Sequence, residues 1–146
     1  RFHAPLAGRV VSITDVAGAL LSVNPIAVNS SYADVFTENK RSVLLLDAPG
    51  VGRVAFVAVG ATLVGSIRWT VQEGQLLAKG EELGYFAFGG STCVLLLPDA
   101  APVAWDEDLR ANSHKSLETL VKVGEQIGLC RAGDQGCDED SQESAA

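Results

Sequence analysis

The residues best suited to chemistry lie in the stretch FAFGGSTCVLLL, residues 86–97, where two glycines precede a serine and a threonine. Glycine adopts positive φ without a steric penalty, so a turn here can present the hydroxyls of Ser91 and Thr92. A plain hairpin would favour Asn-Gly or Asp-Gly over Gly-Gly followed by two hydroxyls. A glycine bulge, with both hydroxyls bonded to nearby backbone, is the simpler interpretation. The stretch alone leaves both interpretations open.

The remaining candidates for chemistry are few. The two histidines are His3, in RFHAP at the start of the first strand, and His114, among polar residues near a helix start. We expect His114 to be a solvated surface residue. Two distant histidines and unspaced cysteines do not form a metal-ligand set. The glycines of DAPGVG, residues 47–52, lack a following Lys-Ser/Thr and open no helix, so a phosphate-binding loop is not predicted.

Lys79, in LLAKGEEL, raises a different possibility. Lipoyl and biotinyl carrier domains display a lysine at a tight turn between two strands. Lys79 lies near a predicted turn, but it lacks the apolar flanks on both sides that such turns usually show. A non-catalytic carrier or binding domain is therefore kept as an alternative from another functional class.

Composition limits the partners. The chain has 146 residues and a net charge of −7, which argues against nucleic acid and against a polybasic lipid-binding patch. Residues 131–146 hold five acids and one base and are predicted to be a disordered acidic tail. Cys93, Cys130 and Cys137 favour reduced thiols in a reducing compartment, although Cys130 and Cys137 could pair. No apolar run approaches the ~20 residues of a membrane-spanning helix, and the first residue is Arg1 rather than Met, which suggests a fragment or processed piece.

The elements that must position these residues are mostly short strands separated by Gly and Asp, a spacing typical of a β sandwich or barrel. Residues 54–67 are apolar at both odd and even positions, so both faces of this stretch should be buried. We expect it to form two strands broken near Gly60. The other predicted strands are Gly8–Ile13, Ala19–Val23, Ser42–Leu46, Leu83–Phe88 and Cys93–Leu97. A weak internal echo of glycine, strand and glycine turn is compatible with a barrel-sandwich hybrid.

One helix is expected after the strands. From about Asn112 the apolar residues Leu117, Leu120, Val121 and Ile127 recur at helical spacing. Asn112 or Ser113 can cap its start and Gly128 its end. We therefore predict a mainly β fold, a barrel-sandwich-hybrid-like sandwich with one C-terminal helix, as a single domain over residues 1–130.

Six segments together resemble the ordered motif series of the phosphatidylserine decarboxylase family. They are RFHAP, LLSVNP, VFTENKR, VAVGATLVGSI, KGEELGYFAFGGST and LETLVKVGEQIG, spanning Arg1 to about Gly128. The resemblance implies a pyruvoyl enzyme that matures from a self-cleaving precursor. Its cleavage site would lie between Gly90 and Ser91, in a Gly-preceded variant of the family's Gly-Ser-Thr motif.

The resemblance also implies roles for individual residues. Ser91 would attack the Gly90 carbonyl and end as the pyruvoyl group, and His3 would act as the base that takes its proton. An upstream Asp and a second histidine, both outside these residues, would complete the family's arrangement. Ser22, in LLSVNP, is a candidate for the substrate pocket, with a serine bonded to local backbone as the alternative. No metal and no pyridoxal phosphate are expected.

The expected reaction is decarboxylation of phosphatidylserine to phosphatidylethanolamine and CO₂. The resemblance implies a membrane-associated enzyme whose membrane contact lies outside these residues, whose two cleaved chains stay together and which could form a homodimer. A soluble relative that decarboxylates a free aromatic amino acid such as tryptophan is the nearest alternative, and it would be cytoplasmic.

Overall fold

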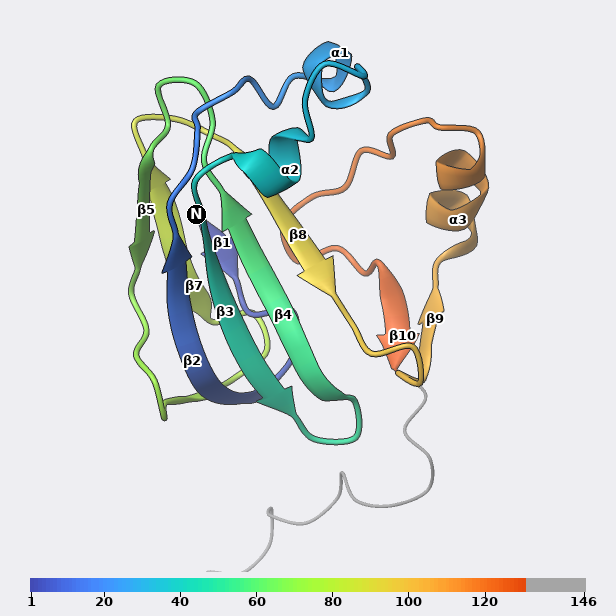
Figure 1. Cartoon of the computed structure of the whole chain (residues 1–146). Helices are drawn as coiled ribbons and strands as arrows, with labels where there is room; N and C mark the ends of the chain where they lie inside the picture. The colour runs from blue at the N-terminus through green and yellow to red at the C-terminus, as the bar shows by residue number, and fades with distance from the viewer. Residues whose placement is uncertain (131–146) are drawn as a thin grey trace, which may run out of the picture. The chain divides into compact units, whose positions relative to one another are not determined.

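A computed structural model of the chain describes residues 1–130 (Figure 1). The chain forms two compact units, Arg1–Ala101 and Pro102–Ala146, and each is described by itself. The tail predicted to be disordered, residues 131–146, lies outside the described residues, as does Cys137.

Unit 1 is built from eight strands and two single-turn helices. In chain order they are β1 (Phe2–His3), β2 (Gly8–Val16), α1 (Pro25–Val28), α2 (Val35–Glu38), β3 (Arg41–Ala48), β4 (Gly52–Val59), β5 (Ser66–Trp69), β6 (Leu76–Leu77), β7 (Glu82–Ala87) and β8 (Thr92–Leu96). Five of them form an antiparallel sheet in the order β6-β2-β3-β4-β8, and the others form a small sheet in the order β1-β7-β5. The predicted mainly β fold is confirmed.

The central strand of the large sheet shows why this sequence pairs as it does. Along β3 the residues alternate between half-buried and fully buried positions, so that Ser42, Leu44 and Leu46 point into the core. This period of two is the spacing of one face of a strand. The predicted break near Gly60 is also confirmed, because β4 ends at Val59 and β5 begins at Ser66.

Aromatic side chains join the two sheets. The ring of Phe2, from β1, lies 5.5 Å from that of Phe56, 5.3 Å from that of Trp69 and 5.2 Å from that of Phe86. The contacts to Trp69 and Phe86 are edge-on, the arrangement that aromatic quadrupoles prefer. Phe2 is buried in the main apolar cluster with residues of both sheets. It therefore anchors the two-residue strand β1, which pairs only with β7.

A buried polar link also joins the sheets. The Trp69 indole Nε1 donates to the hydroxyl oxygen of Ser42 at 2.7 Å, and that hydroxyl donates to Asp15 Oδ1 at 2.5 Å. Ser42 is almost completely buried, so its hydroxyl needs these partners. Hydrogen bonds are directional, so this link fixes the position of β5 relative to β3 and β2 more narrowly than apolar packing alone would.

The predicted strand Ala19–Val23 is wrong. These residues form an extended loop whose one bridge pairs Ala19 with Asn39. The Asn39 side chain takes the place of a neighbouring strand: its Oδ1 accepts from Leu21 N and its Nδ2 donates to Leu21 O, both at 2.8 Å. The same Nδ2 donates to Gly60 O at 2.8 Å. A fully buried amide thus holds the loop against the end of β4.

Unit 2 contains β9 (Val103–Trp105), α3 (Glu107–His114) and β10 (Gly128–Cys130), with β9 and β10 antiparallel. The helix predicted from about Asn112 to Gly128 is wrong in position. The helix begins after Asp106, where Glu107 and Asp108 favour its N-terminus. It ends because Ser116 adopts φ 56° and the Leu117 N–H bonds back to Asn112 O.

The apolar residues that suggested the later helix stay at the surface. Leu117 and Leu120 are both exposed, so within unit 2 their helical spacing corresponds to no buried face. Within residues 1–130 no helix is long and apolar enough to cross a membrane, and no cluster of three potential metal ligands occurs.

The hydrogen bonds of Asn39 lead to a stability prediction. Asn39→Leu should lower the free energy of unfolding by about 3 kcal/mol or more, because two carbonyls and one N–H lose their buried partner. Asn29→Ala is the control: Asn29 is exposed, and its change should stay within about 0.5 kcal/mol. Urea unfolding of both variants measures the difference. Equal stabilities would show that water replaces the amide at no cost.

Candidate active site

Three loops meet at one end of unit 1. The register pairs Val16 with Arg41, Arg41 with Val59 and Val59 with Thr92, so four strand ends lie side by side. The loops that leave this end are residues 17–40, 60–65 and 88–91, at the top of unit 1 in Figure 1. Segments far apart in the sequence, including LLSVNP, VFTENKR and FGGST, are therefore gathered at one edge.

The turn before Ser91 is conformationally strained. Phe88 has φ 68° and Gly89 has φ 144°, both outside the usual range of L residues. Gly89 tolerates this φ, whereas Phe88 adopts it at an energetic cost of roughly 1 kcal/mol or more. A Cβ on Gly90 would meet nothing within 4 Å, so open space surrounds the residue whose carbonyl precedes Ser91. No other part of the chain therefore crowds the side-chain position of Gly90.

Ser91 is half-buried at the junction of this turn and β8. Its Oγ donates a hydrogen bond of 2.5 Å to the carbonyl oxygen of Val59, on the neighbouring strand β4. The carbonyl fixes the position of the hydroxyl, but a carbonyl oxygen is far too weak a base to remove the proton. The arrangement therefore positions a nucleophile without activating it.

Asn39 lies next to the contact between Ser91 and Val59. Its amide binds the carbonyl of Gly60, the residue directly after Val59, and the Gly60 N–H donates to Lys40 O at 2.7 Å. The residue after the end of β4 is thus held through both its N–H and its carbonyl. Asn39 and the Val59 carbonyl are parts of the site that the sequence did not reveal. A backbone acceptor has no residue signature, whereas an Asn directly before an apolar strand was a signal that could have been followed.

Cys93 is the nearest alternative nucleophile in the sequence. It lies in β8 opposite Ala58. Part of Cys93 reaches the surface, yet desolvation raises the pKa of its thiol from 9.0 to about 11. The thiolate is the reactive form of cysteine, and at neutral pH this thiol stays protonated. Cys93 is therefore a poor rival to Ser91.

His3 lies at the other end of β7 from Ser91. The register pairs His3 with Glu82, the first residue of β7, whereas Ser91 follows the last residue, Ala87, by four positions. At about 3.4 Å per residue, β7 alone spans about 17 Å. β7 thus separates the end at which His3 pairs with Glu82 from the end that leads into the Ser91 turn. The roles of His3 and Ser91 stay predictions of the family resemblance.

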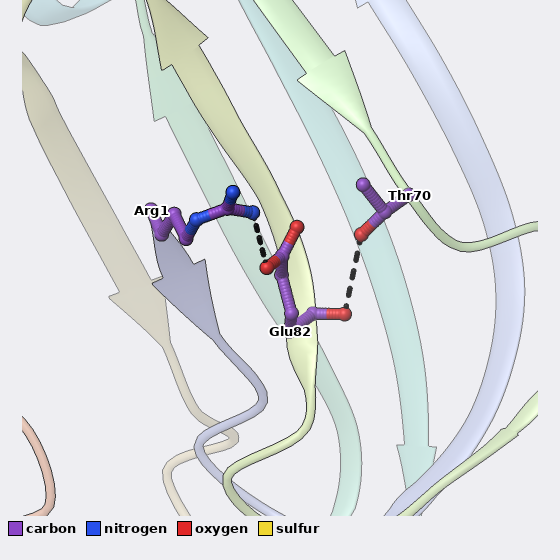
Figure 2. Close-up of polar contacts among 3 residues, drawn as sticks. All are labelled: Arg1, Thr70 and Glu82. Carbon is purple, nitrogen blue, oxygen red and sulfur yellow. Dashed lines mark hydrogen bonds and ion pairs between the residues drawn. The ribbon is translucent and has the colours of Figure 1, made fainter.

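The neighbours of Glu82 show what holds this end of β1. Arg1 forms an ion pair with the Glu82 carboxylate (Figure 2). Its guanidinium also lies 5.7 Å from the centre of the Tyr85 ring. Thr70 Oγ1 donates to the Glu82 carbonyl oxygen at 3.4 Å. These are mostly solvent-exposed contacts, whose energies are small. They orient β1 along β7, while the burial of Phe2 supplies most of its anchoring.

The other sequence candidates lie at different places in the fold. Ser22 is exposed in the loop before α1, and its Oγ accepts from Asn24 N at 3.2 Å, the local bond considered as the alternative to substrate binding. Lys79 is exposed in the turn between β6 and β7. His114 ends α3 and lines a cavity of about 540 Å³ within unit 2. The substrate-binding role of Ser22 stays a prediction.

Comparison with known proteins gives a consistent answer. Residues 1–129 match the family described as phosphatidylserine decarboxylase. Over 129 residues the chain is 52% identical to phosphatidylserine decarboxylase proenzyme 2 of Oryza sativa subsp. japonica, covering 88% of this chain and 20% of that protein. It is 48% identical over 128 residues to proenzyme 3 of Schizosaccharomyces pombe, covering 88% of this chain and 13% of that protein.

A bacterial relative is matched over the same region. The phosphatidylserine decarboxylase proenzyme of Chlamydia trachomatis serovar D is 41% identical over 128 residues, which are 88% of this chain and 42% of that protein. The chain thus spans less than half the length of these curated relatives. The match nevertheless covers almost all of the described residues. The chain belongs to the phosphatidylserine decarboxylase family.

Proposed function

We propose that this chain carries the self-cleavage site and the catalytic β domain of a pyruvoyl-dependent decarboxylase that acts on phosphatidylserine. Family membership supports the reaction, and one observation supports the site: the Ser91 hydroxyl is held on Val59 O directly after a strained, unhindered glycine turn. The relatives' names describe proenzymes, which fits a protein that matures by cleavage.

Cleavage would begin with attack of Ser91 Oγ on the carbonyl carbon of Gly90. The peptide C–N bond breaks as the C–O bond forms, so the amide becomes an ester and the Ser91 nitrogen becomes a free amine. Removal of the Ser91 α-proton then expels the Gly90 carboxylate and leaves dehydroalanine. Water replaces the amine, releasing ammonia and leaving a pyruvoyl group at the new N-terminus. The strain at Phe88 and Gly89 would be released once elimination separates Gly90 from Ser91, which favours cleavage as a whole.

The pyruvoyl ketone supplies an electron sink for decarboxylation of a substrate that carries an amine. The residues present fit its formation, since the serine is preceded by two small residues and fixed by one carbonyl. After cleavage the segment that begins at Ser91 stays in the sheet. β8 pairs with β4 from Thr92 to Leu96, so the chain that begins at Ser91 stays joined to residues 1–90 through one sheet.

The base that takes the Ser91 proton is proposed to be His3, and this assignment rests on the resemblance. In the structure the Ser91 hydroxyl donates to Val59 O, so it would have to leave that carbonyl to give its proton to His3. The binding role of Ser22, the membrane-associated location and the homodimer likewise stay predictions. None of them is needed for the cleavage chemistry at Ser91.

The first prediction concerns the nucleophile. Ser91→Ala should abolish cleavage of a full-length precursor, since no other hydroxyl is bonded to Val59 O. The fold should lose only about 1 kcal/mol, the value of one hydrogen bond. Thr92→Val, which removes the neighbouring hydroxyl from a strand position, should cleave normally. Denaturing gels and intact mass give the readout, and two mature chains from Ser91→Ala would refute the mechanism.

The second prediction tests the base. His3→Ala in the full-length precursor should leave mostly uncleaved protein, because an unassisted hydroxyl is a weak nucleophile at neutral pH. His114→Ala removes the other histidine and should cleave at the wild-type rate. Normal processing of His3→Ala would refute the role of His3 as the base. His3 would then be only the β1 residue that pairs with Glu82.

The third prediction separates the two substrates. Cleaved full-length enzyme should release CO₂ from phosphatidylserine in mixed micelles and none from free tryptophan. Sodium borohydride should inactivate it by reducing the ketone, and intact mass should show a chain blocked at its N-terminus. CO₂ released from tryptophan alone would instead assign the protein to soluble aromatic amino acid decarboxylation.

A further inference from the structure

Four apolar side chains stand out on unit 1 because they are almost completely exposed. Ile26, Tyr32, Leu63 and Phe88 have relative exposures of 84%, 91%, 88% and 90%, and the next large apolar residue of this unit, Leu76, reaches 67%. All four lie on the three loops at the Ser91 end of the sandwich. We name Ile26, Tyr32, Leu63 and Phe88 the apolar rim.

Two rim residues are exposed at an energetic cost. Leu63 and Phe88 both have positive φ, 64° and 68°, although neither is a residue that favours this conformation. Water contact of a large apolar side chain is unfavourable, and backbone strain adds to it. The two loops touch, since a Cβ on Gly89 would lie 3.3 Å from Val64 Cγ2. Rigid neighbouring loops therefore hold two apolar side chains outward.

The charge around these side chains indicates the partner. The loops 60–65 and 88–91 read GATLVG and FGGS and contain no charged residue. The four side chains are spread over three loops, with Ile26 and Tyr32 both on the loop 17–40, so they suit insertion among fluid acyl chains better than the fixed pockets of a protein partner. Exposed apolar patches of this kind mark membrane or protein contacts, and uncharged loops can enter the hydrocarbon boundary without burying a charge.

We propose that the apolar rim inserts into the surface of a phospholipid bilayer and so brings the Ser91 turn to the lipid headgroups. The inference rests on the proposed function, in which the substrate is a bilayer lipid. Phe88 lies three residues from Ser91, so a rim at the boundary between headgroups and acyl chains places the cleavage turn at headgroup depth. The membrane contact then lies within this chain, in addition to any contact made elsewhere in a longer protein.

The test measures partition of the full chain onto vesicles of phosphatidylcholine alone and of phosphatidylcholine with phosphatidylserine. The double variant Leu63→Asn/Phe88→Asn removes two rim side chains, and Asn tolerates positive φ, so the loops should keep their shape. We expect partition to fall at least about tenfold for each side chain removed. Loops 60–65 and 88–91 are uncharged, and the loop 17–40 carries only Asp34, Glu38 and Lys40, so apolar insertion should dominate and raising NaCl from about 0.1 M to about 0.5 M should leave wild-type partition nearly unchanged.

Two control variants locate the effect. Leu76→Thr removes the next most exposed apolar side chain of unit 1, which pairs with Arg9 near the start of β2, away from the Ser91 end. Leu120→Asn removes the most exposed apolar residue of unit 2. Both should partition within about twofold of wild type. Circular dichroism and urea unfolding verify that every variant is folded.

The outcomes are distinct from those of the proposed function, because vesicle binding needs neither cleavage nor decarboxylation. The inference would be overturned if the wild-type protein bound neither kind of vesicle. The rim would then be assigned to a protein partner or to another segment of a longer chain. Binding that requires phosphatidylserine and disappears in salt would overturn it as well, since charge would then drive association. Failure to decarboxylate a water-soluble short-chain phosphatidylserine would refute the function while leaving the rim's partition unaffected.

Discussion

The geometry of the Ser91 end depends on one buried amide. Asn39 makes three hydrogen bonds of 2.8 Å, two to Leu21 and one to Gly60, in a place where no strand could supply them. Burying an amide without hydrogen-bond partners is costly. Because only one arrangement of the two segments satisfies every hydrogen bond of Asn39, the amide specifies that arrangement. The Gly60 carbonyl that it binds lies one residue after the Val59 carbonyl that accepts from Ser91 Oγ. A polar constraint thus acts next to the backbone group that positions the candidate nucleophile.

The opposite end of β7 is held by apolar burial, and this has a consequence for His3. β1 has only two residues, so its pairing with β7 would be weak without the Phe2 ring, which packs against Phe56, Trp69 and Phe86. The same ring keeps β1 from sliding along β7, since a shift in register would pull Phe2 from the core. The feature that secures β1 therefore also holds His3 beside Glu82.

Much of the fold could be predicted because it follows from local patterns. The period of two in β3 and the break at Gly60 are visible in the residues themselves, and they give the sandwich. The misplaced elements depended on tertiary contacts. Residues 19–23 are strand-like in sequence, yet they find a side chain, Asn39, in place of a strand. Leu117 and Leu120 have helical spacing, but a helix also needs a surface to bury against, and the positive φ of Ser116 ends α3 before them.

The candidate site divides in the same way. Ser91 could be proposed because glycines followed by hydroxyls are a property of the sequence, whereas its partner Val59 contributes only a carbonyl, which any residue has. The sequence does not show which strand β1 pairs with or in which register. His3 and Ser91 therefore could not be placed on the sheets from the sequence alone. Self-cleavage needs a turn that is strained yet cannot relax. Antiparallel pairing of β8 with β4 on one side, and of β7 with β5 on the other, prevents the relaxation that a free loop would allow.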